Sequence, residues 1–249
     1  MFPKLPLHIR AWNVGLIRLE NLYPKKEGNL FYLTFTYRGK RIKLRDYNAP
    51  PFDSARIIKN EEYRNLDVKR KIVIDIGAYI GDSAIYFAIN GAKEVIAYEP
   101  YPKTCRVTAL NTKGYKCVRV INNAVTGKNG ALMLNADYSG GSDLSHTGGA
   151  RVASISLSSI VERYRLRDAI LKIDCEGSEY EILCNSSRKT LRAFKQIELE
   201  YHYGKERLIK SLTNAGFAVQ SNGPEKIYAR QVKNPHMEMG MILANRIDR

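Results

Sequence analysis

The chain has 249 residues, of which 44% are hydrophobic and 26% charged, a composition typical of a globular protein with a substantial buried core. No apolar run approaches the ~20 residues of a membrane span, and the first residues lack the apolar centre of a signal peptide, so we expect a cytoplasmic protein. The four cysteines stand singly and predict neither a zinc site nor a disulfide framework.

The positive charge is concentrated near the N-terminus. The formal net charge is +15, and residues 1–70 hold 15 Lys/Arg against 7 Asp/Glu, whereas residues 71–249 hold 25 against 18. A basic surface can bind nucleic acid or can serve solubility alone. Any polyanionic partner would therefore be expected to bind the N-terminal region.

Residues 1–70 are predicted to form a basic extension made of a helix, a β-hairpin and a second helix. Apolar residues at helical spacing favour the first helix, from Ala11 to Leu22. Two β-rich runs, 29–37 and 41–45, predict the hairpin, and Arg41, Lys43 and Arg45 alternate along one of its faces. That face is either a solvated cationic surface or a phosphate-binding one. The second helix is expected from Asp53 to Leu66, before a second domain of residues 71–249.

A strand, a glycine turn and a helix follow in direct succession. The β-branched run from Ile72 to Ile76 is typical of a strand buried on both faces of a parallel sheet. Gly77 and Gly81 bracket a tight turn, and Asp82 stands where the N-cap of the next helix is expected. Glycines there allow a ligand to approach the backbone closely. The spacing differs from the G-x-G-x-x-G of dinucleotide-binding proteins and resembles the S-adenosylmethionine loop of class I methyltransferases.

Strands and helices alternate over the rest of the chain, which predicts a doubly wound, mostly parallel α/β sheet. We expect strands at 72–76, 94–98, 116–121, 152–156, 169–173, 196–201, 217–220, 226–230 and 239–245, and a β pair formed by 124–125 and 131–135. Helices are expected at 83–90, 101–112, 157–164, 178–184 and 205–214. The stretch 135–150, rich in glycine and serine, predicts a long loop beside a ligand site.

Polar side chains follow the ends of several predicted strands. Glu99 stands 22 residues after Gly77, close to the ~20 at which an acid reaches the hydroxyls of a bound ribose. Asn123 follows the next strand, where its amide could both donate to and accept from a purine edge. These positions predict a nucleoside site along one edge of the sheet.

Acids and one histidine follow the next two strands. Asp174 and Glu176 come after the strand 169–173, while Glu198, Glu200 and His202 share one face of the strand that follows. A strand covered by helices should not carry three ionisable groups on one face unless that face opens to a cleft or an edge. Crowded carboxylates would also raise the pKa of a nearby histidine.

Five segments together resemble the FkbM family of S-adenosylmethionine-dependent methyltransferases. In order, they are VIDIGAYIGDSAIYFA (73–88), GAKEVIAYEPYP (91–102), NNAV (122–125), ILKIDCEGSEYEIL (170–183) and IELEYH (197–202). The resemblance covers about residues 60–220. It implies a class I, Rossmann-like methyltransferase sheet of seven strands whose last strand is antiparallel and inserted, with S-adenosyl-L-methionine as the cofactor. It also implies methylation, typically of an oxygen.

The resemblance further implies roles for individual residues. The cofactor-binding residues would be Asp75, Gly77, Ala78, Tyr79, Gly81, Asp82, Ser83, Glu99, Pro100, Asn123, Ala124 and Asp174. The resemblance places Asp174 and Glu176 at the reaction centre. Together with Glu200 and His202, which the strand pattern singles out, these are the expected catalytic residues, with His202 or a carboxylate at 174 or 200 as the base. The sequence requires no metal, although three acids near one histidine could hold a divalent ion.

The methyl acceptor is the least determined feature. We expect an oxygen of a small molecule or glycan. The first alternative is an RNA methyltransferase acting on tRNA or rRNA, docked through the basic N-terminal region, whose RNA binding would weaken steeply with salt. The second is a non-catalytic nucleic-acid-binding module that retains a nucleotide pocket.

Overall fold

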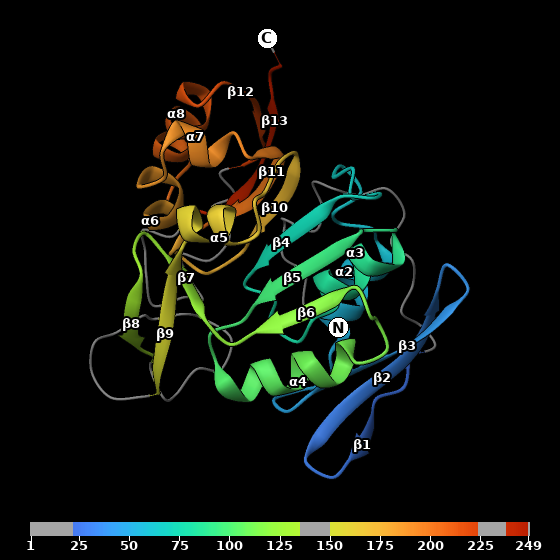
Figure 1. Ribbon diagram of the computed structural model, residues 1–249. Helices are drawn as coiled ribbons and strands as arrows, with labels where there is room; N and C mark the ends of the chain where they lie inside the picture. Colours follow the sequence, from blue (N-terminus) through green and yellow to red (C-terminus); the bar gives the residue numbers. More distant parts are fainter. Residues whose placement is uncertain (1–21, 135–149, 224–237, 249) are drawn as a thin grey trace.

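The computed structural model describes residues 22–134, 150–223 and 238–248. Its centre is one sheet of seven strands (Figure 1). Their spatial order is β12 (Phe217–Ser221), β13 (Gly240–Arg246), β11 (Phe194–Tyr201), β10 (Ala169–Ile173), β4 (Ile72–Ile76), β5 (Glu94–Tyr98) and β6 (Val118–Ile121). β13 is antiparallel to both of its neighbours, and the pairs from β11 to β6 are all parallel. The predicted class I methyltransferase sheet is therefore confirmed.

Two hydrophobic clusters cover the two faces of this sheet, because apolar side chains alternate between the faces along each strand. On β4, Val73 belongs to one cluster and Ile74 to the other. The Val73 cluster includes residues of α2 (Phe52–Lys59) and α3 (Asp82–Ile89). The Ile74 cluster includes residues of α5 (Leu157–Arg163), α6 (Glu179–Cys184), α7 (Arg188–Leu191) and α8 (Glu206–Asn214). None of the helices in the described ranges has both the length and the apolar character needed to cross a membrane.

The N-terminal part forms a three-stranded antiparallel sheet of β1 (Lys25–Glu27), β2 (Leu30–Tyr37) and β3 (Lys40–Asp46). This confirms the predicted hairpin. Leu33 and Leu44 are fully buried, and they belong to the same cluster as Val73. α4 (Pro102–Thr112) lies between this small sheet and the edge strand β6 (Figure 1). The extension thus shares a hydrophobic core with the main sheet, and the boundary near residue 70 stays a prediction.

Two elements differ from the sequence prediction. Residues 124–125 and 131–135 were expected to pair with each other. Instead, β7 (Ala124–Thr126) and β8 (Gly130–Met133) flank β9 (Arg151–Ser156), the first parallel and the second antiparallel to it, in a separate sheet. α2 ends at Lys59 rather than at Leu66, because Glu61 adopts a φ of 53°, in the left-handed region that a helix cannot contain.

Three predicted elements lie outside the described residues. They are the body of the first helix (residues 11–21), most of the glycine-rich loop (135–149) and the strand at 226–230. One short helix was not predicted, namely α7, which begins after Ser187, whose hydroxyl accepts the backbone N–H of Thr190.

Candidate active site

A cleft of about 330 Å³ lies at the carboxyl ends of β4, β5 and β10. This is the edge at which open α/β sheets bind ligands, and the volume is within the range of ligand pockets. Its walls come from the glycine turn after β4, from the ends of β5, β6 and β10, and from α2. Asp53, Ser54 and Ile57 of α2 and the nearby Tyr63 line the side contributed by the N-terminal extension.

The glycine turn presses closely against the end of β10. Gly77 has a φ of 74°, and a Cβ atom there would lie 1.7 Å from the backbone oxygen of Asp174, so only glycine fits. Gly81, with a φ of 91°, is the residue that precedes α3, and it has no side chain with which to cap the helix. Asp82 is the first residue of α3, which corrects the prediction that it caps that helix.

The predicted cofactor-binding residues fall into two groups. Those that line the cleft are Gly77, Tyr79, Asp82, Ser83, Glu99, Pro100, Asn123, Ala124 and Asp174. Asp75, Ala78 and Gly81 are not among the lining residues, and Asp75 and Ala78 are fully buried. Contact of these three residues with the cofactor stays a prediction. Their positions next to the glycine turn show that they help to form it.

Asp75 and Lys172 form a buried ion pair behind the turn. They stand opposite each other on β4 and β10, and the Lys172 Nζ lies 3.2 Å from Asp75 Oδ1. Ser83 donates a 2.6 Å hydrogen bond to the same carboxylate. Lys172 Nζ also donates to the backbone oxygen of Gly77 at 2.7 Å. The pair therefore ties the glycine turn to the neighbouring strand.

Glu99 is held in a fixed orientation by the backbone. Its Oε2 accepts the N–H of Tyr79 at 3.0 Å and its Oε1 accepts the N–H of Tyr101 at 2.9 Å. Burial raises the pKa of Glu99 to about 7 despite these two hydrogen bonds. Each carboxylate oxygen retains a lone pair with which it can accept a further hydroxyl. Asn122 donates to the backbone oxygens of Glu99 and Pro100, so this amide supports the strand end, while Asn123 lines the cleft.

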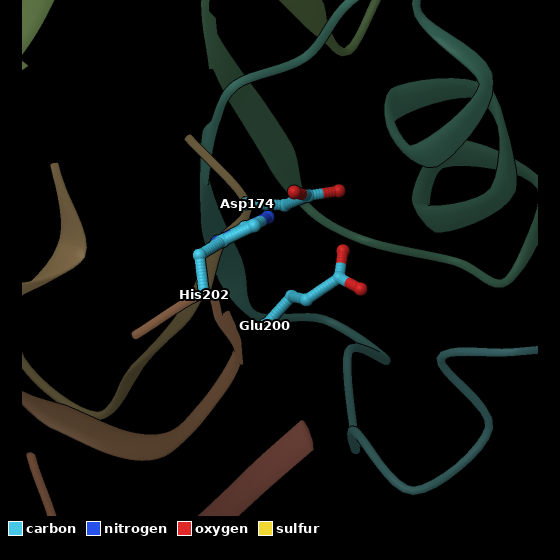
Figure 2. Close-up of side chains that lie close together, drawn as sticks. All are labelled: Asp174, Glu200 and His202. Atoms are coloured by element: carbon cyan, nitrogen blue, oxygen red, sulfur yellow. The ribbon is translucent and has the colours of Figure 1, made fainter. Parts of the chain in front are cut away.

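Asp174, Glu200 and His202 meet at the ends of β10 and β11 (Figure 2). One side-chain oxygen or nitrogen of each lies within 4.8 Å of those of the other two. The prediction that these strands are neighbours is confirmed by their parallel pairing. Burial, reinforced by the charge of Asp174, raises the pKa of Glu200 well above its ordinary value. Burial and the same charge raise the pKa of Glu176 to about 7.

The His202 ring is fully buried, and each of its nitrogens lies near an acid. Nδ1 is 3.0 Å from Glu179 Oε1, and Nε2 is 3.4 Å from Glu176 Oε2. Burial alone would lower the pKa of His202, but the hydrogen bond with Glu179 and the surrounding carboxylates raise it to about 10. This is the direction that the sequence predicts. Neither His202 nor Glu200 is a wall of the cleft, so both lie beyond Asp174 at its end.

Sequence reasoning missed the role of Glu179, the first residue of α6. The side chain is fully buried, and it accepts the backbone N–H groups of Gly177 at 2.7 Å and His202 at 3.1 Å in addition to its contact with the ring. The contact joins α6 to the segment after β11, and nothing in the spacing along the chain signals it.

Glu198 shares its strand with Glu200 but does not reach the cleft. It is 1% exposed, and neither of its carboxylate oxygens has a hydrogen-bond partner among the described residues. Burial, with a contribution from the charge of Glu62, raises its pKa to about 8. The expectation that this face of the strand opens to a cleft or an edge is therefore not met at Glu198.

This burial has a consequence for stability. Between about pH 4.5 and pH 8 the carboxyl of Glu198 ionises in the unfolded chain but stays protonated in the folded one, so its contribution to stability falls as the pH rises. Glu198→Gln removes the ionisation. We expect the gain in unfolding free energy on this substitution to be larger at pH 8.5 than at pH 5 by about 2–4 kcal/mol. Urea unfolding at the two pH values measures it, with the exposed helical Glu162→Gln as a control. An equal effect at both pH values would contradict the assignment.

The cationic face predicted on the hairpin is partly neutralised within the small sheet. Lys43 and Arg45 both contact the carboxylate of Glu27, at 2.7 and 3.3 Å. Lys43 also lies 3.9 Å from the centre of the Tyr32 ring. These two cations are thus engaged within the protein, which reduces the support for a phosphate-binding face.

Residues 75–219 match the model of the methyltransferase FkbM domain. The chain belongs to the FkbM methyltransferase family. It is accordingly a methyltransferase, which overturns the alternative of a non-catalytic nucleic-acid-binding module. No curated protein sequence matches the chain.

Several solved structures are similar to this FkbM family member. A putative S-adenosylmethionine-dependent methyltransferase from Listeria monocytogenes is 14% identical, with 78% of this chain and 100% of that chain covered and a TM-score of 0.49. The tRNA m1G37 methyltransferase of M. jannaschii is 13% identical, with 90% and 59% covered and a TM-score of 0.48. An rRNA methylase from Streptococcus thermophilus is 10% identical, with 74% and 90% covered and a TM-score of 0.45.

Proposed function

We propose that this FkbM family member transfers the methyl group of S-adenosylmethionine to an oxygen of a small molecule or glycan. The observation that carries the proposal is the cleft, which has an oriented carboxylate, Glu99, on one side and the carboxylate and histidine groups beyond Asp174 on the other. These are the groups needed to hold a nucleoside and to handle the proton of a hydroxyl acceptor.

The cofactor side of the cleft fits the nucleoside. Glu99 would accept the ribose hydroxyls, because its two oxygens are oriented by Tyr79 and Tyr101 and lie among the lining residues. Asn123 and Ala124 would lie beside the adenine. Gly77 would let the methionine part approach the backbone, since no side chain stands there.

The acceptor side would be formed by Asp174 and Glu176 together with α2, with Glu200 and His202 beyond Asp174. Methyl transfer is an in-line displacement at the sulfonium methyl, so positioning of the acceptor supplies much of the rate. A hydroxyl acceptor must also lose its proton. A carboxylate at the ends of β10 and β11 could take it near neutral pH, whereas His202, with its pKa raised to about 10, could take it only at higher pH, where the ring is neutral.

The proposal is tested by offering the enzyme labelled S-adenosylmethionine with hydroxylated small molecules, with glycans and with total RNA. Transfer to a hydroxyl of one of the first two classes supports it. Labelling of RNA alone, abolished by moderate salt, would overturn it in favour of the RNA alternative.

Glu99→Ala should weaken the binding of S-adenosylhomocysteine by about 1.5–3 kcal/mol, because charge-assisted hydrogen bonds to the ribose are lost. Isothermal titration calorimetry measures the change. Glu94→Ala, at the opposite end of the same strand, is the matched control and should leave the affinity unchanged. Equal affinity in the Glu99→Ala variant and the wild type would remove Glu99 from the site.

The affinity for S-adenosylhomocysteine should also depend on pH. Because the pKa of Glu99 is raised to about 7 in the free protein, while the ribose hydroxyls are best accepted by the carboxylate, protonation competes with binding. Affinity should fall as the pH is lowered below 7, by up to about tenfold per pH unit. Calorimetry from pH 8 to pH 6 tests this. In Glu99→Gln, the part of the change in affinity with pH that is due to Glu99 should disappear. If the affinity of the wild type changes with pH as that of Glu99→Gln does, the prediction is contradicted.

A further inference from the structure

One nitrogen of the buried His202 ring is unsatisfied. The ring is fully buried, and Nε2 has no hydrogen-bond partner among the described residues. Glu176 Oε2 lies 3.4 Å away but outside hydrogen-bond geometry. Figure 2 shows the ring directed toward Asp174, with the Glu200 carboxylate beside it. A buried nitrogen without a hydrogen bond, aimed at two carboxylates, indicates that a group is missing between them.

The spacing of the three side chains fits a metal ion. One donor atom from each of Asp174, Glu200 and His202 lies within 4.8 Å of the other two. Nitrogen and oxygen donors bind a divalent ion such as zinc at about 2.0–2.2 Å, so two donors on opposite sides of one ion are about 4.4 Å apart. Small side-chain rotations would therefore bring all three onto one ion.

A second carboxylate fixes the orientation of the imidazole. Glu179 Oε1 lies 3.0 Å from Nδ1 and also accepts the backbone N–H of His202, so Nε2 is the nitrogen presented to Asp174 and Glu200. Histidines that bind metals almost always engage their other ring nitrogen in this way. Glu179 is fully buried and fixed by the Gly177 N–H, which is the support that such a site requires.

We propose that Asp174, Glu200 and His202 bind one divalent transition-metal ion, with Glu179 as the positioning residue for His202. Two carboxylates with one imidazole favour an ion such as Mn²⁺ over Ca²⁺, because imidazole is a ligand of transition metals. Three protein ligands leave coordination positions open toward the cleft that Asp174 lines. There the ion would bind the acceptor oxygen and make its hydroxyl more acidic. This role rests on the proposed function, whereas binding of the ion does not.

The test uses Mn²⁺ alone, added to the full-length protein without cofactor or acceptor. Electron paramagnetic resonance of free Mn²⁺ should show one bound ion per chain, which a tenfold excess of Ca²⁺ does not displace. Glu200→Gln should abolish this binding, and Glu179→Gln should weaken it by about 10- to 100-fold, the usual effect of removing the partner of a metal-bound histidine. Glu198→Gln, a buried acid on the same strand outside the cluster, is the matched control and should bind as the wild type does.

Thermal unfolding and binding of S-adenosylhomocysteine, measured on the same preparations, show whether each variant is folded. Folded wild-type protein that binds S-adenosylhomocysteine but no Mn²⁺ would overturn the metal site and leave the proposed methyl transfer standing. Mn²⁺ binding that Glu200→Gln leaves unchanged would overturn it as well. Stoichiometric binding lost in that variant supports the site even where no acceptor has been found.

Discussion

Replacing His202 by alanine should lower kcat by about 10²-fold or more while the affinity for S-adenosylhomocysteine stays nearly constant. The imidazole lies among the carboxylates of Asp174, Glu176 and Glu200 at the end of the cleft, so its loss leaves these carboxylates crowded together without the histidine. Loss of a group that handles protons at a reaction centre usually costs on this scale. The cofactor should be little affected, because His202 is not among the residues that line the cleft. Steady-state kinetics and calorimetry measure the two quantities.

His202→Asn serves as the companion variant. Its amide nitrogen is at the position that matches Nδ1 and can still donate to Glu179, so this variant should keep more of the stability of the wild type than His202→Ala while losing a comparable share of kcat. Full kcat in a folded His202→Ala enzyme would remove the histidine from the reaction. If kcat falls in proportion to the loss of stability in both variants, the ring has only a structural role.

The sheet could be predicted because each of its central strands is a mostly apolar run with a single charged residue. The predicted strands at 72–76, 94–98 and 169–173 are confirmed residue for residue. A short apolar run of this kind is typical of a strand buried on both faces of a parallel sheet. The pairing of residues 124–126 and 130–133 could not be predicted in this way, since both segments are short and their partner, β9, lies beyond a long intervening segment.

The site could be predicted only for side chains that stand at the end of their own strand. Glu99, Asp174, Glu200 and His202 each stand at a strand end, and parallel strands bring their carboxyl ends together. Contacts between side chains of different elements have no corresponding pattern in the sequence. Glu179 reaches His202 from a helix, and Asp75, which does not line the cleft, pairs with Lys172 on the neighbouring strand.

That ion pair gives the largest expected effect on stability. Lys172→Met should lower the free energy of unfolding by about 3–5 kcal/mol, the cost of leaving a buried partner uncompensated. Among side chains of the described residues, only Ser83 would still donate a hydrogen bond to Asp75, and the backbone oxygen of Gly77 would lose the Lys172 donor. The charges of Asp75, Asp174 and Asp82 outweigh the effect of burial and raise the pKa of Lys172 above its ordinary value, so the lysine is charged. Urea unfolding near neutral pH measures the loss.

A double-mutant cycle separates the ion pair from the packing of the lysine stem. Asp75→Asn combined with Lys172→Met no longer buries a lone charge, so the pair of substitutions should cost less than the sum of the single ones, by more than about 1 kcal/mol. The cofactor gives a second measurement, because Lys172 holds the turn that Gly77 forms. Lys172→Met should weaken S-adenosylhomocysteine binding even in the fraction that stays folded. Additive costs in the cycle, with unchanged affinity, would show that the lysine contributes neither charge compensation nor the shape of the turn.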